Sequence, residues 1–299
     1  MKVDWKGVFP AVTTQFHEDL TLDLDLTSKH IEELIQSGIR GLVMLGSLGE
    51  NVTLTLEEKR EIIRLALKVS AGRVPVLSGV AELSTGAGLA WVKELETLGA
   101  QGAMVMPAMA FRPDREETLA HYLTIARGTE LPLILYNNPL AYHADVTPEM
   151  FEIVAEQQNY VGIKESSGDV RRITDIINTV GDRYIMFAGV DDLALESILL
   201  GATGWIAGIG LAFPKENQRL WDLATAGEWE KARELYRWYT PLLHLDVGNK
   251  FVQNIKMAIK EVGLGSEWVR LPRVPLSGAE RERVLGIIHK GLETRPVLD

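Results

Sequence analysis

The sequence of 299 residues contains no cysteine. Disulfide bonds, thiolate nucleophiles and cysteine-ligated metal sites are therefore excluded. No apolar run approaches the length of a transmembrane helix, and the amino terminus, MKVDWKGVFP, lacks the apolar segment of a signal peptide. We therefore expect a cytoplasmic protein that does not bind a membrane.

Basic residues are also scarce, because 31 lysines and arginines stand against 41 aspartates and glutamates, giving a net charge of -10. Such a chain has no electrostatic footprint for nucleic acid. Hydrophobic residues make up 46% and charged residues 24%, which is typical of a globular protein. We expect a small-molecule partner and no nucleic-acid partner.

Short apolar runs alternate with longer helical patterns along most of the chain. The runs are nearly continuous, as expected for strands that are buried on both faces of a parallel sheet. The strand candidates are residues 7–16, 41–46, 74–80, 102–108, 131–138, 161–167, 184–190 and 203–210. Helices are predicted at residues 24–37, 55–70, 84–98, 113–127, 147–156 and 169–180.

Eight such units predict an α/β fold of the (β/α)8 TIM-barrel type, which typically takes about 250 residues. A doubly wound sheet is the alternative, but the glycines of 204–210 do not have the GxGxxG spacing of its dinucleotide site. Three further helices, at 228–245, 248–262 and 278–293, are expected to pack on the side of the barrel. The chain is thus predicted to divide into a barrel (1–226) and a C-terminal helical extension (227–299).

Three polar side chains follow apolar strands at the end where barrel active sites lie. Lys164 ends the sixth strand within VGIKESSGD, Tyr136 ends the fifth, and Ser47 follows the second. Gly162 shares the face of Lys164 and leaves space beneath it. Each residue alone has a structural explanation: Lys164 as an ion pair with Glu165, Tyr136 as a core ring, Ser47 as a loop or cap hydroxyl. Only their shared position favours a site.

The segments GSLGEN (46–51), YNNP (136–139) and GIKESSGD (162–169) resemble the dihydrodipicolinate synthase / N-acetylneuraminate lyase family of class I aldolases. The resemblance implies that Lys164 forms a Schiff base with pyruvate or another 2-oxo acid. It implies Tyr136 as the acid-base group and Ser47 as the first hydroxyl of the family's threonine pair. Neither a metal nor a cofactor is implied.

This chemistry needs a neutral amine, whereas a free lysine has a pKa of about 10.4. Burial in an apolar barrel, with no carboxylate on the same face, would lower that value. The backbone amides of the turn at 46–49 would hold the substrate carboxylate. The residues expected to line the substrate pocket are Gly46, Leu48, Gly49, Asn138, Tyr142, His143, Gly189, Asp191 and Ile206.

Tyr142, His143, Asp191 and Asp192 are the candidates for the far end of that pocket. Alternatively, Tyr142 and His143 could be packing or solvent-facing residues. Asp192 has the alternative of a helix N-cap or first-turn carboxylate.

Three departures from the family pattern bear on the substrate, and the last two remove features that the resemblance implies for the second substrate of the biosynthetic enzyme. Leu48 replaces the second threonine, Ala141 replaces an arginine, and 107–111 contains no tyrosine. We therefore expect a retro-aldolase or dehydratase acting on a 2-keto-3-deoxy or hydroxy-oxo acid. The alternatives are 4-hydroxy-tetrahydrodipicolinate synthase, which uses aspartate semialdehyde, and an inactive binding or regulatory homologue.

Two other barrel chemistries have weaker support. A metal-dependent enzyme would need clustered ligands, but the six histidines form no HxH or HxxxH pair. A phosphate site is compatible with the glycines at 208–210 but has no further support.

The segment MVMPAMAF after the fourth strand places Met106, Met109 and Phe111 where a monomer would expose them. The resemblance implies that this loop meets its twin across a two-fold axis. We expect a homo-oligomer, a dimer of dimers.

Overall fold

Eight parallel strands form the centre of the molecule, a computed structural model that describes residues 3–298. The strands are β1 (Gly7–Val8), β2 (Leu42–Met44), β3 (Val76–Val80), β4 (Gly102–Val105), β5 (Leu133–Asn137), β6 (Tyr160–Glu165), β7 (Ile185–Ala188) and β8 (Gly204–Trp205). Consecutive strands from β2 to β8 pair with one another, and β8 pairs with β1. A parallel bridge between Ala11 and Val43 closes the ring. The predicted TIM barrel is confirmed.

The first strand is much shorter than the apolar run at 7–16 because Pro10 has no amide hydrogen to donate. Its carbonyl oxygen instead accepts a hydrogen bond of 3.0 Å from the amide of Val43, and the Val12 amide donates to Val43 at 2.9 Å. The chain therefore joins β1 to β2 through a bridge rather than a continuous ladder.

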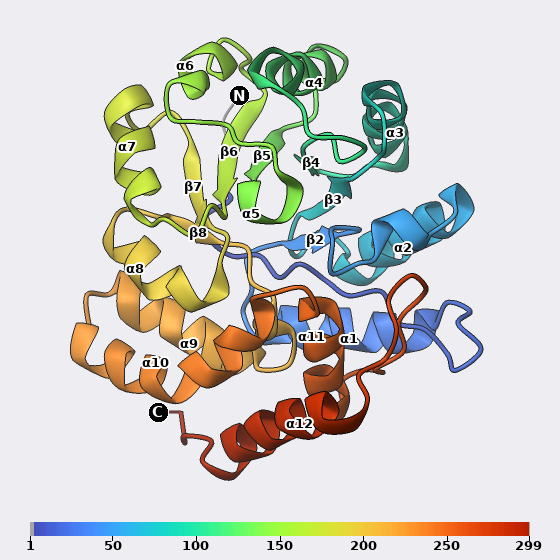
Figure 1. Ribbon diagram of the computed structural model, residues 1–299, viewed down its shortest axis with the longest axis vertical. Helices are drawn as coiled ribbons and strands as arrows, with labels where there is room; N and C mark the ends of the chain where they lie inside the picture. The colour runs from blue at the N-terminus through green and yellow to red at the C-terminus, as the bar shows by residue number, and fades with distance from the viewer. Residues whose placement is uncertain (1–2, 299) are drawn as a thin grey trace.

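Helices surround the barrel, as Figure 1 shows. They are α1 (Leu24–Gln36), α2 (Leu56–Ser70), α3 (Thr85–Leu98), α4 (Arg115–Arg127), α5 (Pro139–Tyr142), α6 (Met150–Val154), α7 (Arg171–Val180), α8 (Ala194–Leu199), α9 (Pro214–Thr225), α10 (Trp229–Leu243), α11 (Phe251–Glu261) and α12 (Gly278–Glu293). Short 3₁₀ turns are η1 (Asn51–Thr53), η2 (Asp191–Leu193), η3 (Ile209–Leu211) and η4 (His244–Asp246). The helix expected at 147–156 is confined to α6, and α5 was not anticipated.

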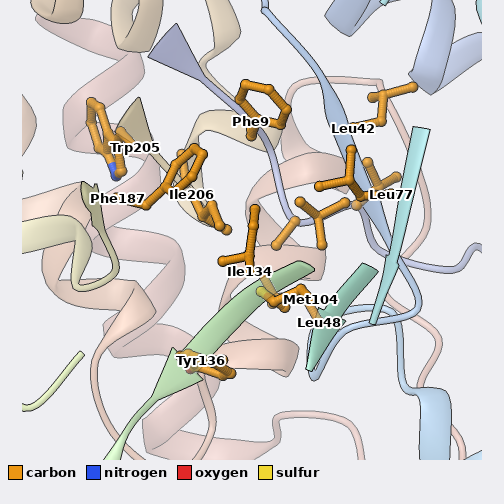
Figure 2. Close-up of a cluster of buried hydrophobic side chains, with 14 of the residues drawn as sticks. Phe9, Leu42, Leu48, Leu77, Met104, Ile134, Tyr136, Phe187, Trp205 and Ile206 are labelled. Carbon is orange, nitrogen blue, oxygen red and sulfur yellow. The ribbon is translucent and has the colours of Figure 1, made fainter. Parts of the chain in front are cut away.

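Two phenylalanines fill the interior of the barrel beneath the ends of the strands. Phe9 and Phe187 meet edge to face, with ring centroids 5.5 Å apart. A β-carbon on Gly41 would overlap Phe9, and one on Gly162 or Gly204 would overlap Phe187. The space that Gly162 leaves is thus occupied by an aromatic ring. In Figure 2, Tyr136 lies beyond this floor, on the far side of Ile134 and Met104.

The C-terminal helices α10 to α12 lie together beside the barrel (Figure 1). The Lys256 ammonium on α11 donates to Glu50 at 2.7 Å, and Tyr239 on α10 donates to Asn217 on α9 at 3.2 Å. These contacts cross the predicted division between 1–226 and 227–299, which stays a prediction. Within residues 3–298, no helix has the length and apolar character needed to cross a membrane.

Candidate active site

Lys164 and Tyr136 are brought together by the pairing of β5 with β6. The two residues are register partners, and the Lys164 Nζ lies 4.3 Å from the centroid of the Tyr136 ring. Both side chains are buried at the carboxyl ends of their strands. The convergence expected from the sequence is therefore present.

Glu165 is not the partner of Lys164. Its carboxylate lies on the other side of β6, where it accepts hydrogen bonds from Asn137 Nδ2 at 3.1 Å and from the Ser167 amide at 2.6 Å. Among residues 3–298, no carboxylate lies within ion-pair distance of the Lys164 ammonium. The ion-pair explanation for Lys164 is thereby removed.

Burial lowers the pKa of the Lys164 amine from its ordinary value of 10.5. Asp246, Tyr142 and Asp191 oppose this change, because the ionised form of each of these groups would favour the ammonium form. The expectation of no carboxylate on the same face concerned the strand itself; Asp246 lines the same cavity from η4, without forming an ion pair with Lys164. Desolvation still dominates, so the site favours the neutral amine relative to water.

The phenol of Tyr136 is held between polar groups. Asn138 Nδ2 donates to its hydroxyl oxygen at 3.0 Å, and its ring meets that of Tyr142 edge to face with centroids 5.8 Å apart. Burial raises the pKa of Tyr136 to about 12. The group therefore stays protonated at neutral pH and can donate its proton.

The turn after β2 forms another wall of the site. The hydroxyl of Ser47 makes a short hydrogen bond with the hydroxyl of Tyr142. Within the described chain, no group accepts from the backbone amides of Ser47 and Leu48, so both are available to an anion. The turn is tightly wound, because Leu45 and Glu50 both take left-handed backbone conformations.

A cavity of about 310 Å³ connects these groups. The predicted site residues that line this cavity are Gly46, Ser47, Leu48, Tyr136, Asn138, Tyr142, Lys164, Gly189 and Ile206. The further lining residues include Ala11, Met104, Ala141, Ser166, Gly208, Asp246, Asn249 and Phe251. Of the described residues that line it, Lys164 is the only one with an amine side chain and Asp246 the only one with a carboxyl side chain.

Three predicted pocket residues do not reach the cavity wall. Asp191 is fully buried, and its carboxylate accepts from Trp205 Nε1 at 2.9 Å and from the Ile209 amide at 2.7 Å. His143 ends α5 in a left-handed conformation. Gly49 packs against Leu45, and its carbonyl oxygen accepts from Thr14 Oγ1 at 2.7 Å. Asp191 and Gly49 are thus held by bonds within the fold, whereas the His143 side chain is exposed.

Asp192 lies in the first turn of η2, as its alternative explanation predicted, and its carboxylate bonds His244 Nδ1 at 2.7 Å. It is not among the residues that line the cavity.

Two residues that matter for the site were not assigned from the sequence. Asp246 enters the cavity from η4, far along the chain. Glu50, within GSLGEN, is fully buried and bonds the Lys256 ammonium and the Arg270 amide at 3.0 Å. The single acidic residue of the GSLGEN motif was the only signal for Glu50. No local signal marked Asp246.

The loop after β4 differs from the expectation at one residue. Met106 is buried, because its amide continues the sheet by donating to the Val80 carbonyl at 3.0 Å. Met109 is half-buried, whereas the Phe111 side chain is 56% exposed. The exposed apolar surface of this loop therefore rests on Phe111.

The described histidines, aspartates and glutamates, from residue 3 to residue 298, form no group of three that could hold a metal ion. His30 and His121 instead bond the backbone carbonyls of Leu211 and Met106. Both are buried residues of the helical layer.

Comparison with known proteins places this site in a family. The model of the dihydrodipicolinate synthetase family matches residues 4–290. The 4-hydroxy-tetrahydrodipicolinate synthase of Archaeoglobus fulgidus is 32% identical over 97% of this chain and 99% of its own.

Two solved structures are also similar. The dihydrodipicolinate synthase of Acinetobacter baumannii, crystallised with pyruvate, superposes with a TM-score of 0.92 at 30% identity, covering 96% of this chain and 99% of that one. A monomeric dihydrodipicolinate synthase variant gives a TM-score of 0.88 at 28% identity, with 96% of each chain covered. The chain belongs to the dihydrodipicolinate synthetase family and is a lyase of the class I aldolase type.

Proposed function

We propose that the protein is a Schiff-base lyase that cleaves or dehydrates a 2-oxo acid. The observation that carries this proposal is the pairing of Lys164 with Tyr136 inside a buried cavity. An amine with a lowered pKa beside a protonated phenol is the combination that imine formation requires.

The proposed reaction starts with attack of the neutral Lys164 Nζ on the keto carbon. Tyr136 supplies the proton with which the carbinolamine hydroxyl leaves as water, and an iminium forms. In an aldol cleavage, the bond between C3 and C4 then breaks, the C4 hydroxyl loses its proton to the Tyr136 phenolate, and the electron pair moves into an enamine. Protonation at C3 and hydrolysis release pyruvate and restore the amine. In a dehydration, the iminium instead loses a C3 proton to the Tyr136 phenolate, and the resulting enamine expels the C4 hydroxyl, which takes that proton back from Tyr136 and leaves as water.

The substrate carboxylate is proposed to lie against the turn after β2. The free amides of Ser47 and Leu48, with the Ser47 hydroxyl, offer donors without a full positive charge. Leu48 brings no hydroxyl, so Tyr142 is the second hydroxyl in this wall. The assignments of Lys164, Tyr136 and Ser47 as catalytic residues stay proposals.

The composition of the cavity supports a substrate whose far end carries no second carboxylate. Ala141 lines the wall where the related synthases have an arginine, and no arginine is among the lining residues. A second carboxylate buried there would be unpaired and would face Asp246. A 2-keto-3-deoxy acid or another hydroxylated 2-oxo acid avoids that cost.

A second candidate is 4-hydroxy-tetrahydrodipicolinate synthase, which condenses pyruvate with aspartate semialdehyde. The name of the Archaeoglobus relative favours it, at 32% identity over nearly the whole chain. The absence of an arginine at Ala141 weighs against it, and the exposed Arg112 or an arginine of another subunit would have to substitute. An inactive binding homologue is the weakest candidate, since it gives no reason for the Lys164–Tyr136 pair.

We also propose a cytoplasmic location and assembly as a homo-oligomer, a dimer of dimers. The exposed Phe111 beside the cavity end of β4 supports a contact between copies of the chain. One of the similar structures is a monomeric variant, so a chain of this fold can also exist without such a contact.

Trapping with borohydride tests the proposed chemistry. Incubation with pyruvate and borohydride should add one stable adduct mass, and peptide mapping should place it on Lys164. Lys164→Ala should fold normally and lose the adduct, whereas Lys215→Ala, at an exposed position of α9, should keep it. An adduct on any other lysine, or none in the parent protein, contradicts the proposal.

A further inference from the structure

The side chain of Asp246 is a carboxylate in the reaction cavity that the chemistry above does not use. It projects from η4 and shares the lining with Lys164. Between residues 3 and 298, it makes no hydrogen bond and no ion pair. A half-buried carboxylate without donors is costly, so the missing donors are expected to come from a ligand.

The position of Asp246 is fixed from three sides. The preceding residue, Leu245, has its carbonyl oxygen bonded by Asn254 Nδ2 at 3.1 Å, and His244 is held by Asp192 at 2.7 Å. Gly208 allows the closest contact, because a β-carbon there would overlap the Asp246 carboxylate. The Asp246 carboxylate therefore packs against the backbone of Gly208, where any larger residue would collide with it.

Its neighbour Asp191 differs in having all the donors that it needs. Trp205 Nε1 and the amides of Gly208 and Ile209 donate to it at 2.9, 3.0 and 2.7 Å. Of the two carboxylates near Lys164, only Asp246 is thus available to a molecule in the cavity.

We propose that Asp246 determines the substrate range by accepting hydrogen bonds from hydroxyl groups beyond C4 of the 2-oxo acid. This inference rests on the proposed Schiff-base function. The wall after β8, where Asp246 meets Gly208, is separate from the β2 turn proposed for the substrate carboxylate. Once the iminium forms, its positive charge favours the ionised form of Asp246. The ionised group strengthens hydroxyl binding and repels a second carboxylate.

A matched set of 2-oxo acids tests this role. All three share a 4-hydroxyl group and differ in the rest of the chain: 4,5,6-trihydroxy-2-oxohexanoate, 4-hydroxy-2-oxohexanoate and 4-hydroxy-2-oxopentanedioate. The variant is Asp246→Asn, which keeps the shape of the side chain. Asp175→Asn is the control, because the same change is made there on the exposed face of α7.

Because Asp246 also acts on the pKa of Lys164, Asp246→Asn is expected to cause some change common to all three acids. Beyond that common change, kcat/KM for the trihydroxy acid should fall by about 10- to 100-fold relative to the monohydroxy acid, the usual effect of losing hydrogen bonds to a charged group. The kcat/KM for the dicarboxylate should rise relative to the monohydroxy acid. An equal fall for all three acids would show that Asp246 acts on the iminium, which overturns the inference. Unchanged values for all three overturn it as well.

Pyruvate trapping on Lys164 separates this test from that of the proposed function. Asp246→Asn should still form the pyruvate adduct, because pyruvate has no hydroxyl group for Asp246 to bind. If the parent protein forms no adduct, the Schiff-base function itself has failed. If the adduct forms and the three acids are not separated by Asp246→Asn, only the assignment of Asp246 has failed.

Discussion

The Lys164 Nζ lies over the ring of Tyr136, 4.3 Å from its centroid, because the two residues are register partners on neighbouring parallel strands. Since both backbones belong to the barrel, the distance does not depend on a flexible loop. The amine and the phenol are therefore preorganised for proton exchange with one bound substrate.

Removal of the phenol should slow turnover without disturbing the barrel. Tyr136→Phe is expected to lower kcat by about 10²- to 10⁴-fold, the range for a positioned proton-transfer group. Ser47→Ala should cost less, because the amides of Ser47 and Leu48 remain. Steady-state kinetics on the preferred 2-oxo acid measure both. If Tyr136→Phe is as active as the parent, the phenol is only a packing residue.

Aspartate semialdehyde should be a poor second substrate. With Ala141 in the wall and Asp246 nearby, its carboxylate meets no described cation in the cavity. We expect negligible condensation with pyruvate. Assays with pure semialdehyde decide the matter, and a kcat/KM of about 10⁴ M⁻¹s⁻¹ or more would establish the synthase instead.

The rate of imine formation should rise with pH through the pKa of Lys164. Burial lowers this pKa below 10.5, whereas Asp246, Tyr142 and Asp191 oppose the change, so the midpoint should lie below 10.5. Tyr136, with a pKa of about 12, should cause no alkaline loss below about pH 11. Single-turnover adduct formation with pyruvate gives the curve. A midpoint at or above 10.5 would mean that the amine is not desolvated.

The same lowered pKa has a consequence for stability. The unfolded chain binds a proton on Lys164 more readily than the folded protein does between the two pKa values. The loss of folding stability caused by protonated Lys164 is therefore complete below the pKa that Lys164 has in the folded protein. It disappears as the pH rises towards 10.5. Lys164→Met, which removes the charge, should raise the free energy of unfolding at pH 7 while abolishing adduct formation.

Glu50 should be important for folding although it touches no substrate. Its ion pair with Lys256 is completely buried, so Glu50→Gln leaves an uncompensated ammonium and should cost about 3–5 kcal/mol. Urea denaturation measures the loss. Glu57→Gln is the control, because its pair with Arg60 is 74% exposed on the carboxylate side and should contribute less than about 1 kcal/mol. Equal effects at the two positions would contradict the assignment.

Assembly should depend on the loop after β4. A charge placed on a two-fold interface appears twice, so Phe111→Asp should shift the protein towards smaller species. Light scattering at low micromolar concentration reports the mass, with Thr97→Asp on the exposed face of α3 as the control. A parent protein that is monomeric and fully active would refute the proposed dimer of dimers.

The barrel and the central residues of the site followed from local sequence patterns. Lys164 and Tyr136 end apolar runs, and the end of a parallel strand fixes where a side chain points. Asp191 also follows a strand, but its carboxylate turns towards the backbone amides of Gly208 and Ile209. Whether the Asp191 carboxylate faces the cavity or bonds these amides depends on where β8 lies, and the local sequence does not contain that information.

Asp246 and Met106 show two further limits of pattern reading. Asp246 reaches the cavity only because α10 returns η4 to the barrel, a tertiary contact with no local sequence mark. Met106 was expected to be exposed at or just past the end of the fourth strand, but its amide bonds the Val80 carbonyl and its side chain is buried. Strand lengths and long-range returns are decided by packing partners that lie elsewhere in the chain.

Because η4 contributes to the cavity wall, the reactive groups and part of the substrate-binding wall come from different segments of the chain. The groups proposed to make and break bonds lie on β5 and β6, whereas Asp246 lies on η4, Phe251 lies at the start of α11 and Asn249 lies between them. A change in residues 246–251 can therefore alter which molecules are accepted while the reactive lysine keeps its surroundings. Related proteins that differ in that short stretch would therefore differ in substrate specificity and share the same reaction.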